Sequence, residues 1–463
     1  MDFTGKKAFS WDVGTVRARY DDRMKHAVAS LLAAVPLWLA GPAQAGAAEP
    51  LTVPECVRRA RERAPEVRIA RAASLAARQD SVGHSFDQRP AYSLFGGAMV
   101  APSGYYDPAL TNLGEYELKV GMDWPLRDAG VRAHGRRAAE LDARAALADQ
   151  RLAVRDAGLR AGELALASVR LSEQARTQRE SLEWLDRLAV ELAAGARAGT
   201  RGKADAQRAA LERDDAVSTL ETTTRAGHSV ARELARWLAL PPDSLAEVIA
   251  PPDDEPLGPP TGDDSLSTLA RYGAAPEIAQ ARIASERARI DLALAKQRRQ
   301  LQLALALDAG LWGSDLTTPV PPDVKASNPN ATFSDRLSRD LGASAALKFS
   351  LPVTDPGALH DVAGRTAAAT AADLRATVTQ NEARRQALEL LDRWRDASLR
   401  VTRARASVAI AEENLLRLRS LHASGAATIL ELLDARNALD DTHLRLAQAR
   451  FDARLARLEA EER

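Results

Sequence analysis

The chain repeats itself, and this repeat limits the folds open to it. Three short segments of the first half return in the second half, in the same order: APEV at 64–67 as APEI at 275–278, WPLRDAG at 124–130 as LPVTDPG at 351–357, and KADAQ at 203–207 as LLDAR at 432–436. Such self-similarity indicates two copies of one structural unit. We expect the first repeat over 46–240 and the second over 265–463. The segment 241–264 between them is rich in Pro, Asp and Gly, which predicts a linker.

Both repeats predict the same order of elements: a helix, two short strands, and a hairpin made of a very long helix and a return helix. The first helix is expected over 53–88 and, in the second repeat, over 265–300. The predicted strands span about 91–101 and 115–126, then about 301–312 and 343–353. The predicted hairpins span about 131–240 and 358–460.

The long helices lack proline from 131 to 192 and from 358 to 421, so nothing in the sequence breaks them. At 1.5 Å per residue, about 62 residues make a rod of roughly 90 Å. Apolar residues recur at helical spacing, as at Leu182, Leu185 and Leu188, with charged residues between them. The helices alone are equally typical of a soluble coiled-coil protein.

The strands alternate between apolar and polar residues, so one face of each is apolar. Segments of about 9–11 residues with this alternation are typical of transmembrane β-barrels. The residues expected to face lipid are Tyr116, Leu118, Val120, Met122, Trp124, Leu301, Leu303, Leu305, Leu307, Leu347 and Phe349. Aromatic residues near the strand ends, Trp312 among them, would form an aromatic belt. The alternative is a pair of soluble hairpins with one face on a core.

Four strands cannot close a barrel, because the two outer strands would leave unpaired backbone groups in lipid. If the strands lie in a membrane, the chain must share a barrel with copies of itself. The count of strands predicts an oligomer and leaves the number of copies open.

The N-terminal region predicts export. A basic start at Lys25-His26, an apolar run over 27–40 and Ala43-Gln44-Ala45 together make a secretory signal peptide, which we place at 1–45. The apolar run is too short for a spanning helix, and no later stretch has the ~20 apolar residues that one needs.

The composition argues against several other classes of protein. The 63 basic and 63 acidic side chains balance, which gives no electrostatic case for a nucleic-acid partner. The seven histidines lack ligand spacing and the single cysteine lacks a partner, so we expect no zinc or copper site and no cofactor. Neither a phosphate-binding GxxxxGK[ST] loop nor a GxSxG elbow is present, so we expect no enzyme.

The duplicated order of helix, two strands and long hairpin, after a signal peptide, resembles the TolC family of outer-membrane efflux proteins. Two local motifs strengthen the likeness. The family typically leaves its second strand through a Pro-hydrophobic-x-Asp-Gly-Gly turn, which is PLRDAG at 125–130 here. At the tip of its second hairpin it has a Gly and then an Asp-hydrophobic-Leu-Asp-Ala segment, which is Gly425 and then ELLDA at 431–435 here.

The resemblance implies a mainly α fold with a transmembrane β-barrel. Four strands from each subunit of a homotrimer would make a 12-stranded barrel in the cell outer membrane, and the helices would continue it as a tunnel through the periplasm. The chain would be the passive exit duct of a tripartite efflux pump or a type I secretion system. Its partners would be a periplasmic adaptor (membrane fusion protein) and an inner-membrane transporter. Members of the family carry drugs, metal ions or proteins.

The resemblance also implies functional residues at the hairpin tips. Some members close the tunnel with acidic side chains, and the matching positions are Glu431 and Asp434. The open alternative is that these two cap a helix and form ion pairs between helices. The residues expected to contact the adaptor are Gly195, Arg197, Gly199, Arg201, Lys203, His422 and Gly425. The competing interpretation of the whole chain is a periplasmic adaptor or a structural coiled-coil protein.

Overall fold

The computed structural model describes residues 50–87, 89–99, 115–128, 130–199, 202–241, 248–252, 257, 275–297, 300–314, 320, 322–351 and 356–462. The chain divides into two units, 1–49 and 50–463, and the fold described here is that of the second unit. The predicted signal peptide at 1–45 lies outside the described residues.

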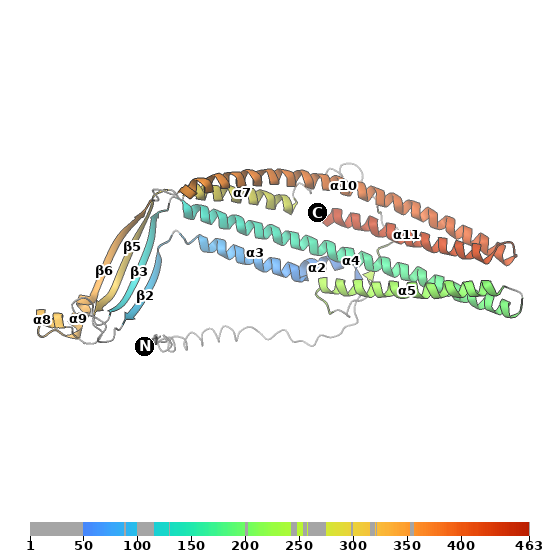
Figure 1. Ribbon diagram of the computed structural model, residues 1–463, viewed down its shortest axis with the longest axis horizontal. Helices are drawn as coiled ribbons and strands as arrows, with labels where there is room; N and C mark the ends of the chain where they lie inside the picture. The colour runs from blue at the N-terminus through green and yellow to red at the C-terminus, as the bar shows by residue number, and fades with distance from the viewer. Residues whose placement is uncertain are drawn as a thin grey trace, which may run out of the picture. The chain divides into compact units, whose positions relative to one another are not determined.

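Each repeat contributes one long helical hairpin. The helices of the first repeat are α2 (Val53–Arg63), α3 (Pro65–His84), α4 (Val131–Arg197) and α5 (Lys203–Trp237). Those of the second are α7 (Pro276–Gln297), α10 (Pro356–Ala423) and α11 (Ile429–Glu462). Figure 1 shows α4 with α5, and α10 with α11, as two hairpins side by side. With 67 residues, α4 extends for about 100 Å.

The single helix predicted over 53–88 is wrong in one respect, because it is broken at Ala64. The backbone of Ala64 is extended, with φ −52° and ψ 137°. Pro65 follows it, and a proline disfavours the helical conformation in the residue before it. The equivalent helix α7 of the second repeat also begins at its proline, Pro276.

The start of this helix makes the same kinds of contact in both repeats, one buried apolar residue and one ion pair, with partners from different helices. Val67 and Ile278 are buried at equivalent positions. Glu66 forms an ion pair with Arg236 of α5 at 2.8 Å, and Glu277 forms one with Arg155 of α4 at 2.6 Å. The repeated APE motif therefore anchors the short helix of each repeat to the first hairpin, to which Arg236 and Arg155 both belong.

One antiparallel sheet collects the strands of both repeats. Its strands are β2 (Ala91–Met99), β3 (Glu115–Arg127), β5 (Gln302–Ser314) and β6 (Leu341–Ser350). Their order is β2-β3-β5-β6, so β3 and β5 join the two repeats and β2 and β6 lie at the edges. The observed strands agree with the predicted ones within three residues at each end, and the sheet lies at one end of the helices (Figure 1).

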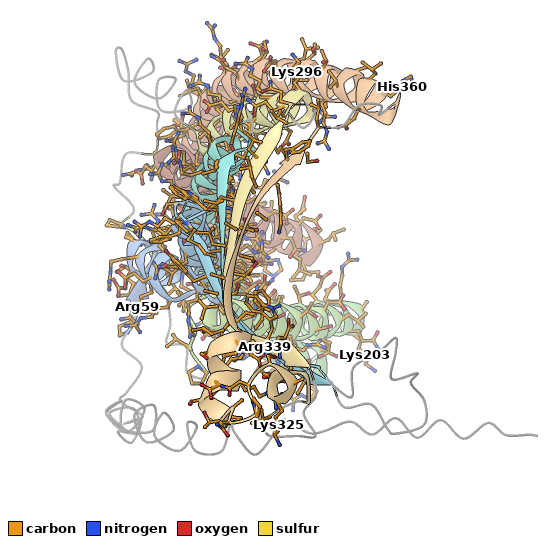
Figure 2. All side chains as sticks on the ribbon, turned by 90° about the vertical axis from the view of Figure 1, so that its left-hand side faces the viewer. Arg59, Lys203, Lys296, Lys325, Arg339 and His360 are labelled. Atoms are coloured by element: carbon orange, nitrogen blue, oxygen red, sulfur yellow. The ribbon has the colours of Figure 1, made fainter. Side chains whose placement is uncertain are left out.

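The connection from β5 to β6 contains two helices that the sequence analysis missed, α8 (Pro322–Ser327) and α9 (Phe333–Asp340). They lie at the end of the sheet that points away from the long helices, and Figure 2 shows Lys325 and Arg339 there. Arg336 of α9 is buried and pairs with Asp340 at 3.3 Å, and the Tyr116 hydroxyl donates to the same carboxylate. These contacts fix α9 to the end of β3.

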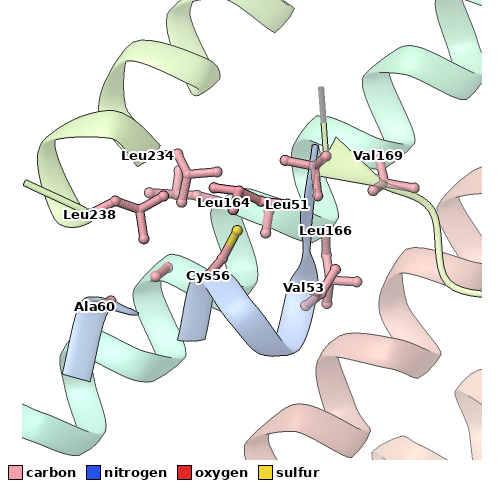
Figure 3. Packing of buried hydrophobic residues seen from close by; sticks show 12 residues of the cluster. Leu51, Val53, Cys56, Ala60, Leu164, Leu166, Val169, Leu234 and Leu238 are labelled. Carbon is pink, nitrogen blue, oxygen red and sulfur yellow. The ribbon is translucent and has the colours of Figure 1, made fainter. Parts of the chain in front are cut away.

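A small parallel sheet lies against the middle of the long helices. β1 (Leu51–Thr52) pairs with β4 (Val248–Ile249), which falls inside the predicted linker. Around it is the hydrophobic cluster shown in Figure 3, which joins α2, α4 and α5. Its members include Cys56, Leu164 and Leu234.

The described residues of the segment 241–264 contact both hairpins, since Val248 belongs to the cluster with α4 and α5 and the residues after it contact α10 and α11. The Trp394 indole N–H donates to the Leu257 carbonyl at 2.7 Å, and Leu257 is buried among residues of α10 and α11. The Arg454 guanidinium donates to the Pro251 carbonyl at 3.0 Å. The connection between the repeats thus ties the first hairpin to the second.

Cys56 gives a test of the central cluster. Burial raises the pKa of its thiol to about 11, so we expect iodoacetamide to label Cys56 at pH 8 only after denaturant opens the cluster. Since the folded thiol holds its proton more tightly than the unfolded one, the free energy of unfolding should also fall as the pH rises from about 9 to 11. Labelling of the native protein as fast as of the unfolded protein would contradict this packing, and Cys56→Ser serves as the unlabelled control.

Candidate functional site

The register of the sheet brings the predicted lipid-facing residues onto one face. Leu118 lies opposite Leu311, Met122 opposite Leu307, and Trp124 opposite Leu305. On the next pair of strands Leu305 lies opposite Leu347 and Leu303 opposite Phe349. Leu301 lies one residue before β5 begins. Since directly opposite residues share a face, these side chains form one apolar surface, which we call the outer face.

The outer face is exposed in the single chain. Leu118 and Val120 are each 52% exposed, Leu347 is 61% exposed and Phe349 is 75% exposed. Large apolar side chains exposed together mark a surface that contacts a membrane or another protein. That this surface meets lipid remains a prediction.

The opposite face of the sheet, which we call the inner face, is built from polar and small residues. Lys119 lies opposite Gly310, and Gly121 lies opposite Asp308. Trp312 lies opposite Glu117 and therefore on the inner face. The expectation that Trp312 joins an outward aromatic belt is therefore wrong, because the outward positions of β5 are odd-numbered.

The PLRDAG motif is a helix cap. The Asp128 carboxylate accepts hydrogen bonds from the backbone N–H groups of Gly130 at 2.9 Å and of Arg132 at 2.8 Å. Gly130 has φ 83°, a left-handed conformation that favours glycine. The motif therefore turns the chain sharply from β3 into α4. The matching residues 352–355 of the second repeat lie outside the described residues.

Both hairpin tips end their long helix at a left-handed glycine. Gly199 has φ 75° and Gly425 has φ 77°, and backbone N–H groups beyond each helix bond back to its last carbonyls. Arg197 and Lys203 are exposed beside Gly199, and Gly195 lies in the last turn of α4. At the other tip the His422 ring Nδ1 lies 3.0 Å from the Ala427 carbonyl. Arg201 lies outside the described residues.

The two candidate constriction residues behave differently. Glu431 accepts from the Thr428 N–H at 2.7 Å, and the Thr428 hydroxyl accepts from the Glu431 N–H at 3.3 Å, which is a capping box at the start of α11. The hydrogen bond from the Thr428 backbone lowers the pKa of Glu431, so this carboxyl stays ionised. Asp434 is exposed one turn further on, while Leu432 and Leu433 are buried. The capping alternative thus describes Glu431, and both remain candidates for the pore.

Polar contacts near the tips join the two hairpins, and the sequence analysis missed them. The Ser181 hydroxyl of α4 donates to the Asp440 carboxylate of α11 at 2.6 Å. Arg436 pairs with Asp440 at 2.9 Å, and its guanidinium lies 5.9 Å from the Trp184 ring centroid. Burial raises the pKa of Asp440 against the opposing effects of Ser181 and Arg436. The periodicity of a helix cannot show such a pair, because its members are 259 positions apart.

Within the part of the chain that the structure describes, no helix is both long and apolar enough to cross a membrane. The same residues contain no group of three His, Cys, Asp or Glu side chains that could hold a metal ion.

Comparison with known proteins identifies the fold. The chain is similar in structure to the outer membrane protein VceC from Vibrio cholerae, with a TM-score of 0.72 and 16% identity over 88% of this chain and 95% of that one. It is similar to the CmeC outer membrane channel of Campylobacter jejuni, with a TM-score of 0.70 and 13% identity over 89% of this chain and 84% of that one. A membrane protein from Pseudomonas aeruginosa gives a TM-score of 0.73 at 15% identity, with 89% of both chains covered.

No protein-family model matches the sequence, and no curated protein matches it in sequence. The structural likenesses establish that the chain has the fold of outer-membrane channel proteins. The mainly α fold with two long hairpins and a four-stranded sheet, expected from the resemblance to the TolC family, is therefore confirmed, while the shared 12-stranded barrel stays a prediction.

The outer face can be tested by placing a charge on it. Arginine in place of Leu305 should reduce membrane assembly, because a cation at the lipid-facing midplane costs ~2–4 kcal/mol. The matched control is Ala346→Arg, which lies on the inner face of the neighbouring strand. Yields of assembled protein in the membrane fraction should fall for Leu305→Arg alone. Equal yields for both variants would contradict the assignment of the faces.

The two acidic tip residues can be separated by substitution. Glu431→Ala should speed hydrogen exchange of the first amides of α11, because it removes the capping box. Asp434→Ala should leave that exchange unchanged, since Asp434 makes no part of the cap. If Asp434 lines a pore, its loss should lower the cation selectivity of single channels. Fast exchange in both variants, or in neither, would contradict the distinction.

Proposed function

We propose that this chain is one subunit of a homotrimeric outer-membrane channel that serves as the passive exit duct of a tripartite efflux pump or a type I secretion system. The observation that carries the proposal is the four-stranded sheet, whose apolar outer face is exposed and whose edge strands are β2 and β6. In a trimer, β6 of each subunit would pair with β2 of the next, and twelve strands would close one barrel.

The outer face would then contact outer-membrane lipid, and the inner face would line the lumen. The division of residues fits this arrangement, since apolar side chains gather on one face and, Phe95 and Trp312 apart, mainly polar or small ones on the other. Closure would also satisfy the backbone groups of both edges, which lipid cannot do.

The hairpins would continue the lumen as a tunnel through the periplasm. Their length of about 100 Å suits a duct that reaches toward the inner membrane. The tips at Gly199 and Gly425 would meet a periplasmic adaptor (membrane fusion protein), which links the channel to an inner-membrane transporter. The transporter would supply the energy, as the resemblance to the TolC family implies.

The signal peptide predicted at 1–45 supports export to this location. The competing interpretation, a periplasmic adaptor or structural coiled-coil protein, has no need for an exposed apolar face on a four-stranded sheet. Both rivals are expected to be soluble, which makes the difference measurable.

Membrane fractionation and conductance test the proposal together. Cells expressing the full chain are separated into periplasm, inner membrane and outer membrane, and the purified protein is added to planar lipid bilayers. We expect the protein in the outer-membrane fraction and discrete ion-conducting steps in the bilayer. Recovery from the soluble periplasmic fraction, with bilayers that stay silent, would favour the adaptor or coiled-coil interpretation. The Leu305→Arg variant is the control for contaminating porins, because it should give fewer channels at equal protein load.

A further inference from the structure

The inner face of the sheet carries two aromatic side chains that its polar and small surroundings do not cover. Phe95 on β2 is 52% exposed and Trp312 on β5 is 38% exposed. Their neighbours on this face include Ser93, Glu117, Lys119, Gly121, Asp308 and Gly310. Large exposed aromatic rings are unusual on a surface of otherwise polar and small residues and indicate a contact site.

Lys119 connects the two rings. Phe95 lies directly opposite Lys119 across β2 and β3, and Trp312 lies opposite Glu117 across β3 and β5. The Lys119 Nζ lies 5.3 Å from the Trp312 ring centroid and 2.7 Å from Glu117 Oε2. A cation over an indole ring is held by electrostatic attraction. Phe95, Lys119 and Trp312 therefore lie near one another on the inner face of three neighbouring strands, and we call these three residues the aromatic strip.

Each ring occupies space that a side chain would otherwise fill. A Cβ at Gly121 would lie 2.9 Å from the Phe95 ring, and a Cβ at Gly342 would lie 2.5 Å from two atoms of the Trp312 ring. The rings thus lie against the backbone of the sheet, where any larger residue would displace them. Because Gly121 and Gly342 have no side chain, the two rings can lie close to the backbone of the sheet, and the rest of their surface stays accessible.

The strip lies in the half of the sheet away from the long helices. Trp312 and Glu117 are two residues from the Glu115–Ser314 pair that ends the β3–β5 ladder, and β3 leaves its other end toward α4. In the proposed trimer this is the outward end of the lumen, and three copies of the strip would surround it.

We propose that the aromatic strip is a contact site for small planar aromatic molecules in transit through the channel. The inference rests on the proposed function, which makes this face the wall of a closed lumen that solutes in transit would pass. Two aromatic rings that meet in an offset-stacked or edge-to-face arrangement gain stabilisation beyond that of their buried area. The Lys119 ammonium group beside the indole could attract the π-face of a passing ring or an anionic substituent on it.

The experiment measures how long a solute blocks single channels of the full protein in planar bilayers. The probes are N-acetyl-tryptophanamide and, as the aliphatic control, N-acetyl-leucinamide, both without net charge. The test variant carries both Phe95→Leu and Trp312→Leu, because leucine still covers the glycines but has no ring. The control variant is Trp124→Leu, which removes an aromatic ring from the outer face.

In the wild-type channel we expect the tryptophan derivative to block for longer than the leucine derivative. The double variant should shorten the aromatic blocks roughly threefold to tenfold and leave the aliphatic blocks unchanged. Trp124→Leu should behave as the wild type. Unchanged aromatic blocks in a conducting double variant would overturn the inference and assign the rings a packing role over Gly121 and Gly342.

The failure of the inference is distinguishable from that of the proposed function. If the wild-type protein forms no conducting channels, the proposed function fails and the contact site falls with it. If the double variant conducts with an unaltered subunit count but keeps its aromatic blocks, only the contact site is wrong.

Discussion

The backbone groups at the two edges of the sheet are the constraint on which the rest of the structure depends. β2 and β6 each pair with one neighbour in the single chain, and the face they share exposes large apolar side chains. An apolar surface needs a covering, and open edges need partners. Lipid meets the first need and fails the second. Further copies of the chain would pair with both edges, which is why we propose a shared barrel.

The long helices keep the two repeats aligned with each other along their whole length. α4 does this by contacting α7 and α11 of the second repeat along its course. Arg155 pairs with Glu277 at 2.6 Å, and Ser181 donates to Asp440 at 2.6 Å. The segment between the repeats closes the arrangement, because Leu257 is buried against α10 and α11. These contacts between the repeats hold the two hairpins side by side, and with them the two halves of the sheet.

The sequence predicted the elements that depend on a period. Alternation along β3 and β5 assigned Leu118 and Leu305 to one face, and the same rule applied to Trp312 would have assigned it inward. Two local signals were also present in the sequence, namely the proline after Ala64 and the Thr428–Glu431 capping box. Ser181 and Asp440 could not be paired, because their contact requires the placement of one hairpin against the other. The contact between α9 and Tyr116 could not be predicted for the same reason, because it depends on how two separate elements are placed.

The central claim is that the sheet closes only with copies of this chain, and the subunit count tests it most directly. Native mass spectrometry of the protein, extracted in detergent from separated outer membranes, measures that count. The account predicts three subunits in a single stable species. A monomer or dimer that stays dispersed without detergent would contradict it, because the outer face and both edges would then be covered in another way.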